Sequence, residues 1–395
     1  MKKLLIHFAK DRNSGEFRRI VRLDNDSNKI LGSETIELVF LPLYMIRKTK
    51  EFYKSKIGTR IIVCPVRLPF VRFSFIARAN RIIESICIRI VKAIYKPDII
   101  WSETLSAGAP VIGITGFKVA DFHGDVIDEA SYQGASESTL ALLAKWQQNI
   151  LDVANVIVVQ SEEMKRHIID RYKADDKKVI IYHCGVNTDL FDYTQVDILQ
   201  IKKNLGISES DIVFVYTGGD QPWQMLHKTL LIFREIQRMM PQCKFLILLQ
   251  GDKEALLEYC KDNNITNVQI LQNIAFKDVY KYLSLANFAW LLRENIQLNR
   301  VASPTKLGEY LACGQIVITT KVAHSWEWLP TEDIVLVNPE DYTNAAISVI
   351  QKLESVKDFT AEKIKMRELA LNNLSSRKDT ASLSTIGTLF RKTRK

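Results

Sequence analysis

The residues best suited to chemistry in this 395-residue chain lie in the segment 303–314, SPTKLGEYLACG. Ser303 suits a helix N-cap, and Pro304 suits the first helical position, where its missing N–H costs nothing. Gly314 is a typical C-terminal stop. The first amides of such a helix lack partners, and the helix dipole together with Lys306 favours an anion there, most simply a phosphate. The alternative is an ordinary capped helix with a surface lysine.

Two other segments end a buried-strand pattern with groups that suit a phosphate. Residues 212–219, IVFVYTGG, end in Gly218 and Gly219, which permit close backbone approach and offer N–H groups. Residues 288–293, FAWLLR, end in Arg293, whose guanidinium suits a pyrophosphate. A structural turn and a surface ion pair are the respective alternatives. Neither G-x-G-x-x-G nor G-x-x-x-x-G-K-[ST] occurs, which argues against NAD enzymes and P-loop NTPases.

The elements that must position these groups alternate between short apolar runs and helical patterns. We predict strands at 3–8, 37–41, 61–64, 98–101, 110–114, 156–160, 179–182, 212–217, 244–249, 268–271, 288–292, 316–319 and 334–337. Helices are predicted at 76–95, 136–153, 162–172, 225–239, 253–263, 277–285, 304–313 and 341–354. Apolar strands that alternate with helices indicate parallel sheets covered on both faces.

Thirteen strands are too many for one comfortable open sheet. We therefore expect an α/β protein with two doubly wound domains and a seam at about residues 190–200. Ligands of such sheets lie outside the carboxyl ends of the strands, so two facing domains would leave a cleft that holds the motifs. The tail, 376–395, carries an apolar strip that predicts a final docked helix.

Composition is that of a soluble globular protein, with 47% hydrophobic and 25% charged residues. Six scattered cysteines without a C-x-x-C pair indicate free thiols in a reducing compartment. The apolar run that begins MKKLLIHF is too short for a signal peptide and fits a first strand. No stretch reaches the length of a membrane span. We expect a cytoplasmic protein, or one on the inner face of a membrane.

The net charge of +9 is unevenly distributed. The segment Arg60–Lys96 holds eight basic residues and one acidic residue, Glu84, threaded among many apolar side chains. Such a basic amphipathic stretch can lie on an anionic membrane. The alternative is a solvated helix pair packed on a sheet. Nucleic acid is not expected as a partner, because no recognised binding motif accompanies the charge.

Taken together, the motifs resemble a known family. Four segments in order closely resemble the second half of family 4 glycosyltransferases, retaining enzymes of the GT-B fold, and in particular their bacterial surface-polysaccharide members: GVNTDLF (185–191), FVYTGG (214–219), VQILQNIAFKDVYKYLSLAN (268–287) and SPTKLGEYLACGQIVIT (303–319). More loosely, DFHGDVIDEA (121–130) and VVQSEEMKRHI (158–168) resemble that family's acceptor-side domain. The resemblance is strong from about residue 155 to 320 and faint in residues 1–100.

The resemblance implies an organisation and a donor site. It implies two Rossmann-like domains, 1–190 on the acceptor side and 195–375 for the nucleotide sugar, with a helix in 376–395 returning to the first domain. Glu309 matches the glutamate that binds the nucleotide ribose, and we expect it with Lys306 on an exposed helix start. The donor-binding candidates are Gly218, Gly219, Lys228, Arg293, Ser303, Pro304, Thr305, Lys306, Leu307 and Glu309.

On the acceptor side, the resemblance assigns His123 to a position near the transferred sugar. The flanking Asp121, Gly124 and Asp125 mark an exposed loop after a strand, although a lone histidine is often structural. His123 and Glu309 are the catalytic candidates. The acceptor-binding candidates are Ser14, Gly15, Asp121 and Glu129. One departure from the family is Val301, which stands where a second glutamate commonly contacts the sugar.

The implied reaction moves a sugar, with retained configuration, from a nucleotide-diphosphate donor to a saccharide acceptor, expected to be lipid-linked, in surface polysaccharide biosynthesis. The helix amides, the glycine amides, Lys306 and Arg293 would stabilise the departing diphosphate. This chemistry requires no metal and no cofactor beyond the nucleotide sugar, so we expect neither. Two rivals stay open: a GT-B nucleotide-sugar epimerase, and a non-catalytic GT-B binding protein, which Val301 favours.

Overall fold

The computed structural model describes the chain except residues 9–14, 55–56, 69–73, 323–328, 376–380 and 394–395. The chain divides into two compact units, Met1–His183 with Asp379–Lys395, and Cys184–Lys378. The boundary precedes the seam expected at 190–200, because Val186 and Phe191 pack in the core of the second unit.

The first unit is built on a seven-stranded parallel sheet with the order β3-β2-β1-β4-β5-β6-β7. The chain order reverses between β1 and β4, which makes their carboxyl ends the switch point where doubly wound sheets bind ligands. The strands are β1 (Lys2–Phe8), β2 (Glu34–Pro42), β3 (Arg60–Arg67), β4 (Ile99–Glu103), β5 (Phe117–Phe122), β6 (Val156–Val159) and β7 (Val179–Ile181).

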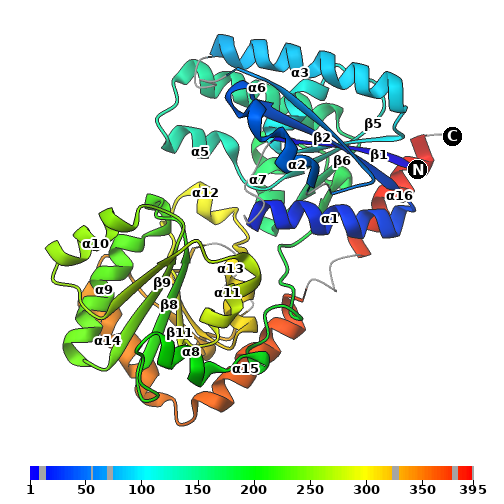
Figure 1. Cartoon of the computed structure of the whole chain (residues 1–395). Coiled ribbons are helices and arrows are strands. Elements are labelled where there is room, and N and C mark those ends of the chain that lie inside the picture. The colour runs from blue at the N-terminus through cyan, green and yellow to red at the C-terminus, as the bar shows by residue number, and fades with distance from the viewer. Residues whose placement is uncertain (9–14, 55–56, 69–73, 323–328, 376–380, 394–395) are drawn as a thin grey trace. The chain divides into compact units, whose positions relative to one another are not determined.

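Helices cover both faces of this sheet (Figure 1). They are α1 (Gly15–Leu31), α2 (Thr49–Lys54), α3 (Ser74–Tyr95), α4 (Thr104–Gly108), α5 (Val126–Tyr132), α6 (Glu137–Val153), α7 (Glu162–Tyr172) and α16 (Ser384–Thr393), with short 3-10 turns η1 (Leu43–Lys48), η2 (Ala109–Val111), η3 (Asp176–Lys178) and η8 (Ala381–Leu383).

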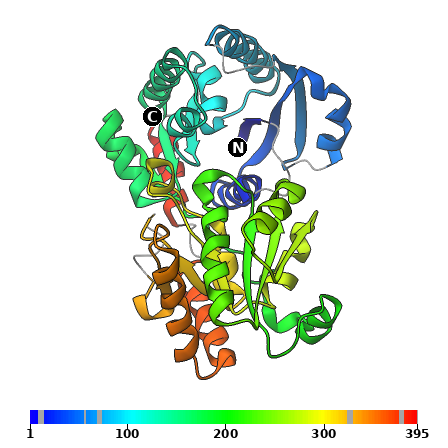
Figure 2. The same ribbon diagram turned by 90° about the vertical axis from the view of Figure 1, so that its left-hand side faces the viewer.

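Two apolar cores lie on opposite faces of the first sheet, because successive strand residues point to opposite sides. Leu5 of β1 packs in one core with α1 and α16, and Leu4 packs in the other with α3 and η2. The buried strip consists of Leu383, which lies just before α16, and of Ile386 and Phe390 within that helix. Figures 1 and 2 show this C-terminal helix, in red, within the first unit.

One predicted strand is wrong. Residues 110–114 form no strand; η2 begins at Ala109 and includes Pro110, which has no N–H to donate to a central ladder. The strand in this part of the chain is instead β5, which pairs with β4 on one side and with β6 on the other. Its sequence, FKVADF, escaped prediction because Lys118 and Asp121 interrupt the apolar run.

The second unit has a six-stranded parallel sheet with the order β10-β9-β8-β11-β12-β13 and a switch point between β8 and β11. The strands are β8 (Ile212–Gly218), β9 (Cys243–Leu249), β10 (Val268–Gln272), β11 (Phe288–Leu291), β12 (Ile316–Thr319) and β13 (Ile334–Leu336). The helices are α8 (Ile198–Asn204), α9 (Leu226–Met239), α10 (Lys253–Asp262), α11 (Phe276–Leu283), α12 (Gln297–Arg300), α13 (Thr305–Ala312), α14 (Tyr342–Ser355) and α15 (Phe359–Asn373), with η4 (Tyr193–Gln195), η5 (Pro222–Gln224) and η7 (Thr331–Asp333) as 3-10 turns.

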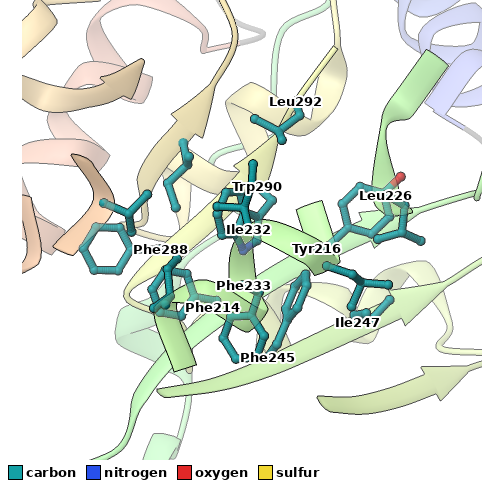
Figure 3. Packing of buried hydrophobic residues seen from close by; sticks show 14 of the residues in the cluster. Phe214, Tyr216, Leu226, Ile232, Phe233, Phe245, Ile247, Phe288, Trp290 and Leu292 are labelled. Carbon is teal, nitrogen blue, oxygen red and sulfur yellow. The ribbon is translucent and has the colours of Figure 1, made fainter. Parts of the chain in front are cut away.

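Aromatic packing fixes the two strands at this switch point against each other (Figure 3). The ring of Phe214 on β8 stacks on Phe288 and Trp290 of β11, with centroids 5.1 and 5.8 Å apart. All three are fully buried, and burial of a side chain of this size contributes roughly 1.5–3 kcal/mol to folding. The carboxyl ends of β8 and β11 are therefore held in a defined register.

No helix in the described part of the chain is both long enough and apolar enough to cross a membrane.

Candidate functional site

The predicted phosphate-binding groups of the second unit gather at its switch point. Gly218 is the last residue of β8, Arg293 follows β11 by two residues, and α13 begins at Thr305, between β11 and β12. The backbone of Arg293 is fixed on both sides by Thr320: its N–H donates to the Thr320 hydroxyl at 2.9 Å, and that hydroxyl donates to its carbonyl at 2.8 Å. Arg293 thus leaves the strand end in a set direction.

A buried tyrosine ties α13 to the end of β8. The hydroxyl oxygen of Tyr310 accepts a hydrogen bond from the Thr217 N–H at 3.0 Å and lies 3.3 Å from the Thr217 hydroxyl. Tyr310 is fully buried, so this link is shielded from water. It brings the first turn of α13 beside Gly218.

Lys306 crosses directly over the backbone of Gly218. Its ammonium group donates to Gln224 Oε1 at 2.6 Å and lies 4.7 Å from the centroid of the Tyr216 ring. A Cβ atom on residue 218 would stand 2.1 Å from this ammonium nitrogen, and the φ of Gly218 is +132°. Only glycine therefore permits this approach.

The two cations of the site repel each other, and the Glu309 carboxylate offsets this repulsion only in part. Burial, and then repulsion by Arg293, hold the pKa of Lys306 well below its usual value. Burial also lowers the pKa of Arg293. Among the described residues, neither side chain forms an ion pair. An anion bound here would relieve the repulsion between them, so the arrangement suits a multiply charged anion such as a diphosphate.

The helix start differs from the prediction by one residue. Pro304, not Ser303, occupies the N-cap position of α13, and no side chain caps the helix. Helix geometry leaves the Thr305 and Lys306 amides without partners, whereas the Leu307 amide already donates to the Pro304 carbonyl at 3.2 Å. Two amides of the predicted set, not three, are thus open to an anion.

The end of α13 matches the prediction. Gly314 has φ +82°, and the Gly314 and Gln315 amides donate back to the carbonyls of Leu311 and Tyr310, at 2.9 and 3.0 Å. This is a Schellman ending, which favours glycine at that position.

Three other predicted positions have distinct surroundings. Glu309 is only 7% exposed and Lys306 is half-buried, so the expectation that both lie on an exposed helix start is wrong. Glu309 faces inward one turn after Lys306. Val301, at the end of α12, is fully buried. Lys228, in the first turn of α9, pairs with Glu340, which already offsets its charge.

Gln224, Tyr216 and Tyr310 complete the site, although no role could be assigned to them from the sequence. Gln224 Oε1 lies 2.6 Å from the Lys306 ammonium and 2.8 Å from the Tyr216 hydroxyl. The Tyr216 hydroxyl is also 2.5 Å from the Gly219 carbonyl oxygen. For these three residues, the one sign of a role in the sequence was that Gln224 lies shortly after the glycine pair.

A second polar cluster lies in the first unit, at the carboxyl ends of β4 and β5. His123 Nε2 is 2.7 Å from both Glu103 Oε2 and Asp121 Oδ2, and Nδ1 is 3.1 Å from Glu16 Oε1. Arg19 of α1 pairs with Asp121. His123 and Asp121 were predicted as site residues; Glu103, Glu16 and Arg19 were not.

Opposed charges set the protonation of this cluster. Burial, and then the neighbouring Asp121, raise the pKa of Glu103. Burial works against the charged forms of Asp121 and His123, but Arg19 and His123 lower the pKa of Asp121 overall, and Asp121 raises that of His123. The cluster thus favours a charged imidazole between two carboxyl groups, one of which gains a proton more readily than the other.

The cluster also has the composition of a metal site, as does a second group made of Asp125, Asp128 and His167. In both groups a carboxylate already contacts a neighbouring side chain: Arg19 pairs with Asp121, and His167 Nε2 is 2.5 Å from Asp125 Oδ2. A metal would have to compete with these contacts.

The remaining acceptor candidates are dispersed. Ser14 lies outside the described residues. Gly15 is the first residue of α1, next to the Glu16 that contacts His123. Glu129 lies on α5 and accepts a hydrogen bond from Gln133 at 3.3 Å, a contact along one helix face.

A doubly wound sheet that presents glycine amides and two cations at its switch point is the arrangement of Rossmann-like proteins that bind phosphorylated ligands. Comparison of whole structures specifies the fold further. The chain is similar to sucrose-phosphate synthase from Thermosynechococcus elongatus (TM-score 0.76, 16% identity, 100% of this chain and 99% of that chain covered). It is also similar to WaaG, a glycosyltransferase involved in lipopolysaccharide biosynthesis (0.70, 10%, 98% and 100%), and to Anabaena HepE in complex with UDP and glucose (0.69, 14%, 100% and 99%).

These similarities confirm the predicted fold: two Rossmann-like units of the GT-B type. No protein-family model and no curated protein sequence matches the chain.

The glycine pair supports a direct test with pyrophosphate. Gly218→Ala forces a side chain into a left-handed backbone position and against Lys306, so we expect pyrophosphate affinity to fall at least about tenfold and stability to fall by roughly 1–3 kcal/mol. Gly219→Ala is the matched control, because its Cβ would meet only the flexible end of Gln221. For each variant, calorimetric titration measures the pyrophosphate affinity and urea unfolding measures the stability. Equal pyrophosphate affinity in the two variants would contradict the site.

Proposed function

We propose that this protein is a retaining glycosyltransferase of the family 4 type, which moves a sugar from a nucleotide-diphosphate donor to a saccharide acceptor. The observation that carries the proposal is the pair of half-buried, mutually repelling cations, Lys306 and Arg293, beside Gly218 at the switch point of the second unit. The sequence motifs at these positions resemble that family, and the fold is the one its members have.

In the proposed reaction, the bond between the sugar's anomeric carbon and the diphosphate oxygen breaks while an acceptor hydroxyl bonds to the same face of that carbon. Negative charge develops on the departing diphosphate. Lys306, Arg293 and the amides of Thr305 and Lys306 stabilise this charge without reorganising, because Thr320, Tyr310 and Gln224 already hold them in place. The departing phosphate oxygen takes the hydroxyl proton, so no separate base is needed.

Other parts of the site are assigned by resemblance. Glu309 would bind the ribose hydroxyls of the nucleotide, and His123 would act on the sugar side. Residue 301, where the family commonly has a second glutamate, is a buried valine. Sugar recognition must therefore use other groups. We propose that the reaction needs no metal, since lysine, arginine and amide groups meet the diphosphate charge.

The structural neighbours suggest the chemical setting. HepE has been crystallised with UDP and glucose, and WaaG takes part in lipopolysaccharide biosynthesis. For this chain we accordingly propose a uridine-type nucleotide sugar as the first donor to test, and surface polysaccharide as the product.

A donor-binding experiment tests the proposal. We expect UDP to bind the wild type, Lys306→Met to weaken binding at least about tenfold, and Glu309→Gln to weaken it less, because the first removes a charged contact to the diphosphate and the second removes only contacts to neutral hydroxyls. Titration calorimetry with and without EDTA measures affinity, and EDTA should leave it unchanged. Lys228→Met is the control, since its partner is Glu340. Wild-type UDP affinity in Lys306→Met would refute the donor site.

Products separate the proposal from its rivals. With radiolabelled nucleotide sugars and acceptor, transfer of label to the acceptor supports the transferase. A change in the sugar of the donor itself indicates an epimerase, and binding without turnover indicates a non-catalytic protein.

We further propose that the first unit attaches to an anionic membrane through α3. Five large apolar residues at helical spacing on this helix, Phe75, Ile82, Ile86, Ile90 and Ile94, are 53–69% exposed. Arg78 is exposed on the same face. Arg89, beside that face, is also exposed and donates a hydrogen bond to the Gly113 carbonyl. An apolar strip flanked by cations suits the interface of an anionic bilayer, and a lipid-linked acceptor would be found there.

Vesicle co-sedimentation tests this attachment. We expect wild-type protein to bind anionic vesicles, less at high salt, and to ignore neutral ones. Ile82→Ser, Ile86→Ser and Ile90→Ser together should lower binding at least about tenfold, because the buried apolar area is lost. A control triple, Leu199→Ser, Met239→Ser and Leu257→Ser, removes exposed apolar residues of the second unit. Similar losses in both triples, or wild type in the supernatant at low salt, would count against the membrane proposal.

A further inference from the structure

Two of the six cysteines, Cys64 and Cys87, are only half-buried, whereas the other four are buried. Cys64 lies on β3 and Cys87 lies on α3. Both side chains pack against one apolar core, to which β2 contributes Phe40 and α3 contributes Ile88. Solvent can therefore reach these two thiols, and they come from neighbouring elements of the first unit.

The contacts on either side of the two cysteines show that α3 runs antiparallel to β3. At the end of β3, Glu84 Oε1 of α3 lies 3.9 Å from Arg67 Nε. At the start of β3, the guanidinium group of Arg60 lies 5.7 Å from the ring centroid of Tyr95, the last residue of α3. The two cysteines lie between these contacts, three residues before Arg67 and three residues after Glu84. They therefore face each other across the interface.

The two thiols also interact with each other. Burial raises the pKa of Cys64 to about 11, and the neighbouring Cys87 adds to this rise. Burial raises the pKa of Cys87 as well, whereas a hydrogen bond with Cys64 lowers it. The Cys64 thiol is thus the hydrogen-bond donor of the pair, and the Cys87 thiol loses its proton more readily than its neighbour does.

The helix that carries Cys87 has limited apolar contact with the sheet. Helix α3 is 22 residues long, but its buried residues are Asn80, Glu84, Ile88 and Val91, two of which are polar. Strand β3 is at the edge of the sheet, and its residues after Arg60 are half-buried. A covalent bond between the two elements would add a restraint where packing supplies little.

We propose that Cys64 and Cys87 form a reversible redox pair, which hydrogen peroxide converts into a disulfide that fixes α3 to β3. The Cys87 thiolate attacks one peroxide oxygen, which gives a sulfenic acid and one water. The Cys64 thiol attacks the sulfenic sulfur, which forms the S–S bond and releases a second water. In total, two thiols and one peroxide give one disulfide and two waters, and two electrons pass from sulfur to oxygen. Thiol–disulfide exchange with a dithiol restores both thiols.

The surroundings of the two thiols set the order of the two rates. Because burial raises both pKa values, little thiolate is present at neutral pH, and the attack on peroxide is slow. The attack on the sulfenic acid joins two neighbouring side chains, so it is fast by comparison. The sulfenic acid should therefore not accumulate in the wild type. This inference depends neither on the donor site nor on the membrane proposal.

Peptide mapping by mass spectrometry tests the bond in the full chain after treatment with hydrogen peroxide. We expect a disulfide between the peptides of Cys64 and Cys87, a fall from six titratable thiols to four in the unfolded protein, and full recovery with dithiothreitol. In Cys64→Ser, dimedone should trap a sulfenic acid on Cys87 at least about ten times more than in the wild type, because the second thiol is missing. Cys260→Ser is the control: Cys260 is buried in the second unit, so the disulfide should still form.

Hydrogen exchange tests the consequence for α3. The backbone amides of α3 should exchange at least about threefold more slowly in oxidised than in reduced wild type, and equally under both conditions in Cys87→Ser. Three outcomes would each overturn the inference: peroxide leaves Cys64 and Cys87 unbonded or oxidises only one of them, the disulfide joins two chains, or oxidation leaves the exchange of α3 unchanged. None of these readouts involves UDP, so their failure would leave the proposed function standing.

Discussion

The approach of the Lys306 ammonium group to the backbone of Gly218 is the constraint on which the donor site depends. It requires glycine at the end of β8, and it requires α13 to start beside that strand end. The Tyr310–Thr217 hydrogen bonds provide the second condition, and the stacking of Phe214 on Phe288 and Trp290 aligns β8 with β11, from which Arg293 emerges. Each contact links residues that are far apart in sequence, so the site forms only when the sheet does.

Buried charges are compensated to different extents in the two units. In the first unit, His123 and Arg19 lie against Asp121, and Lys3 lies 2.8 Å from Asp24, so these buried charges are compensated within the protein. At the switch point of the second unit, Lys306 and Arg293 repel each other, and Glu309 offsets that repulsion only in part. Repulsion between buried like charges reduces stability, and a bound anion would recover that loss as binding energy. This contrast supports an anionic ligand for the second unit's cluster.

Sequence reasoning reached the fold class because apolar strands alternate with helices, and the GT-B fold because the motifs stand in a familiar order. It failed at β5, whose Lys118 and Asp121 hide a buried strand, and at 110–114, where Pro110 outweighs the apolar pattern. Gly218 and Lys306 could be predicted as site residues, because glycine and lysine at these positions are residue types that suit a phosphate. Gln224 was not, because its role depends on a contact with Lys306, 82 residues away, which no local pattern records.

The central claim is that a diphosphate binds against Lys306, and proton linkage tests it most directly. The pKa of Lys306 is lowered in the free protein, and an anion favours the charged ammonium, so binding must raise that pKa and take up a proton between the free and bound values. Above the bound value the ammonium is lost and affinity falls. Calorimetry of UDP binding in two buffers with different ionisation enthalpies, repeated at several pH values, measures this uptake. The account predicts proton uptake by the wild type beyond that of Lys306→Met; equal uptake in both would contradict it.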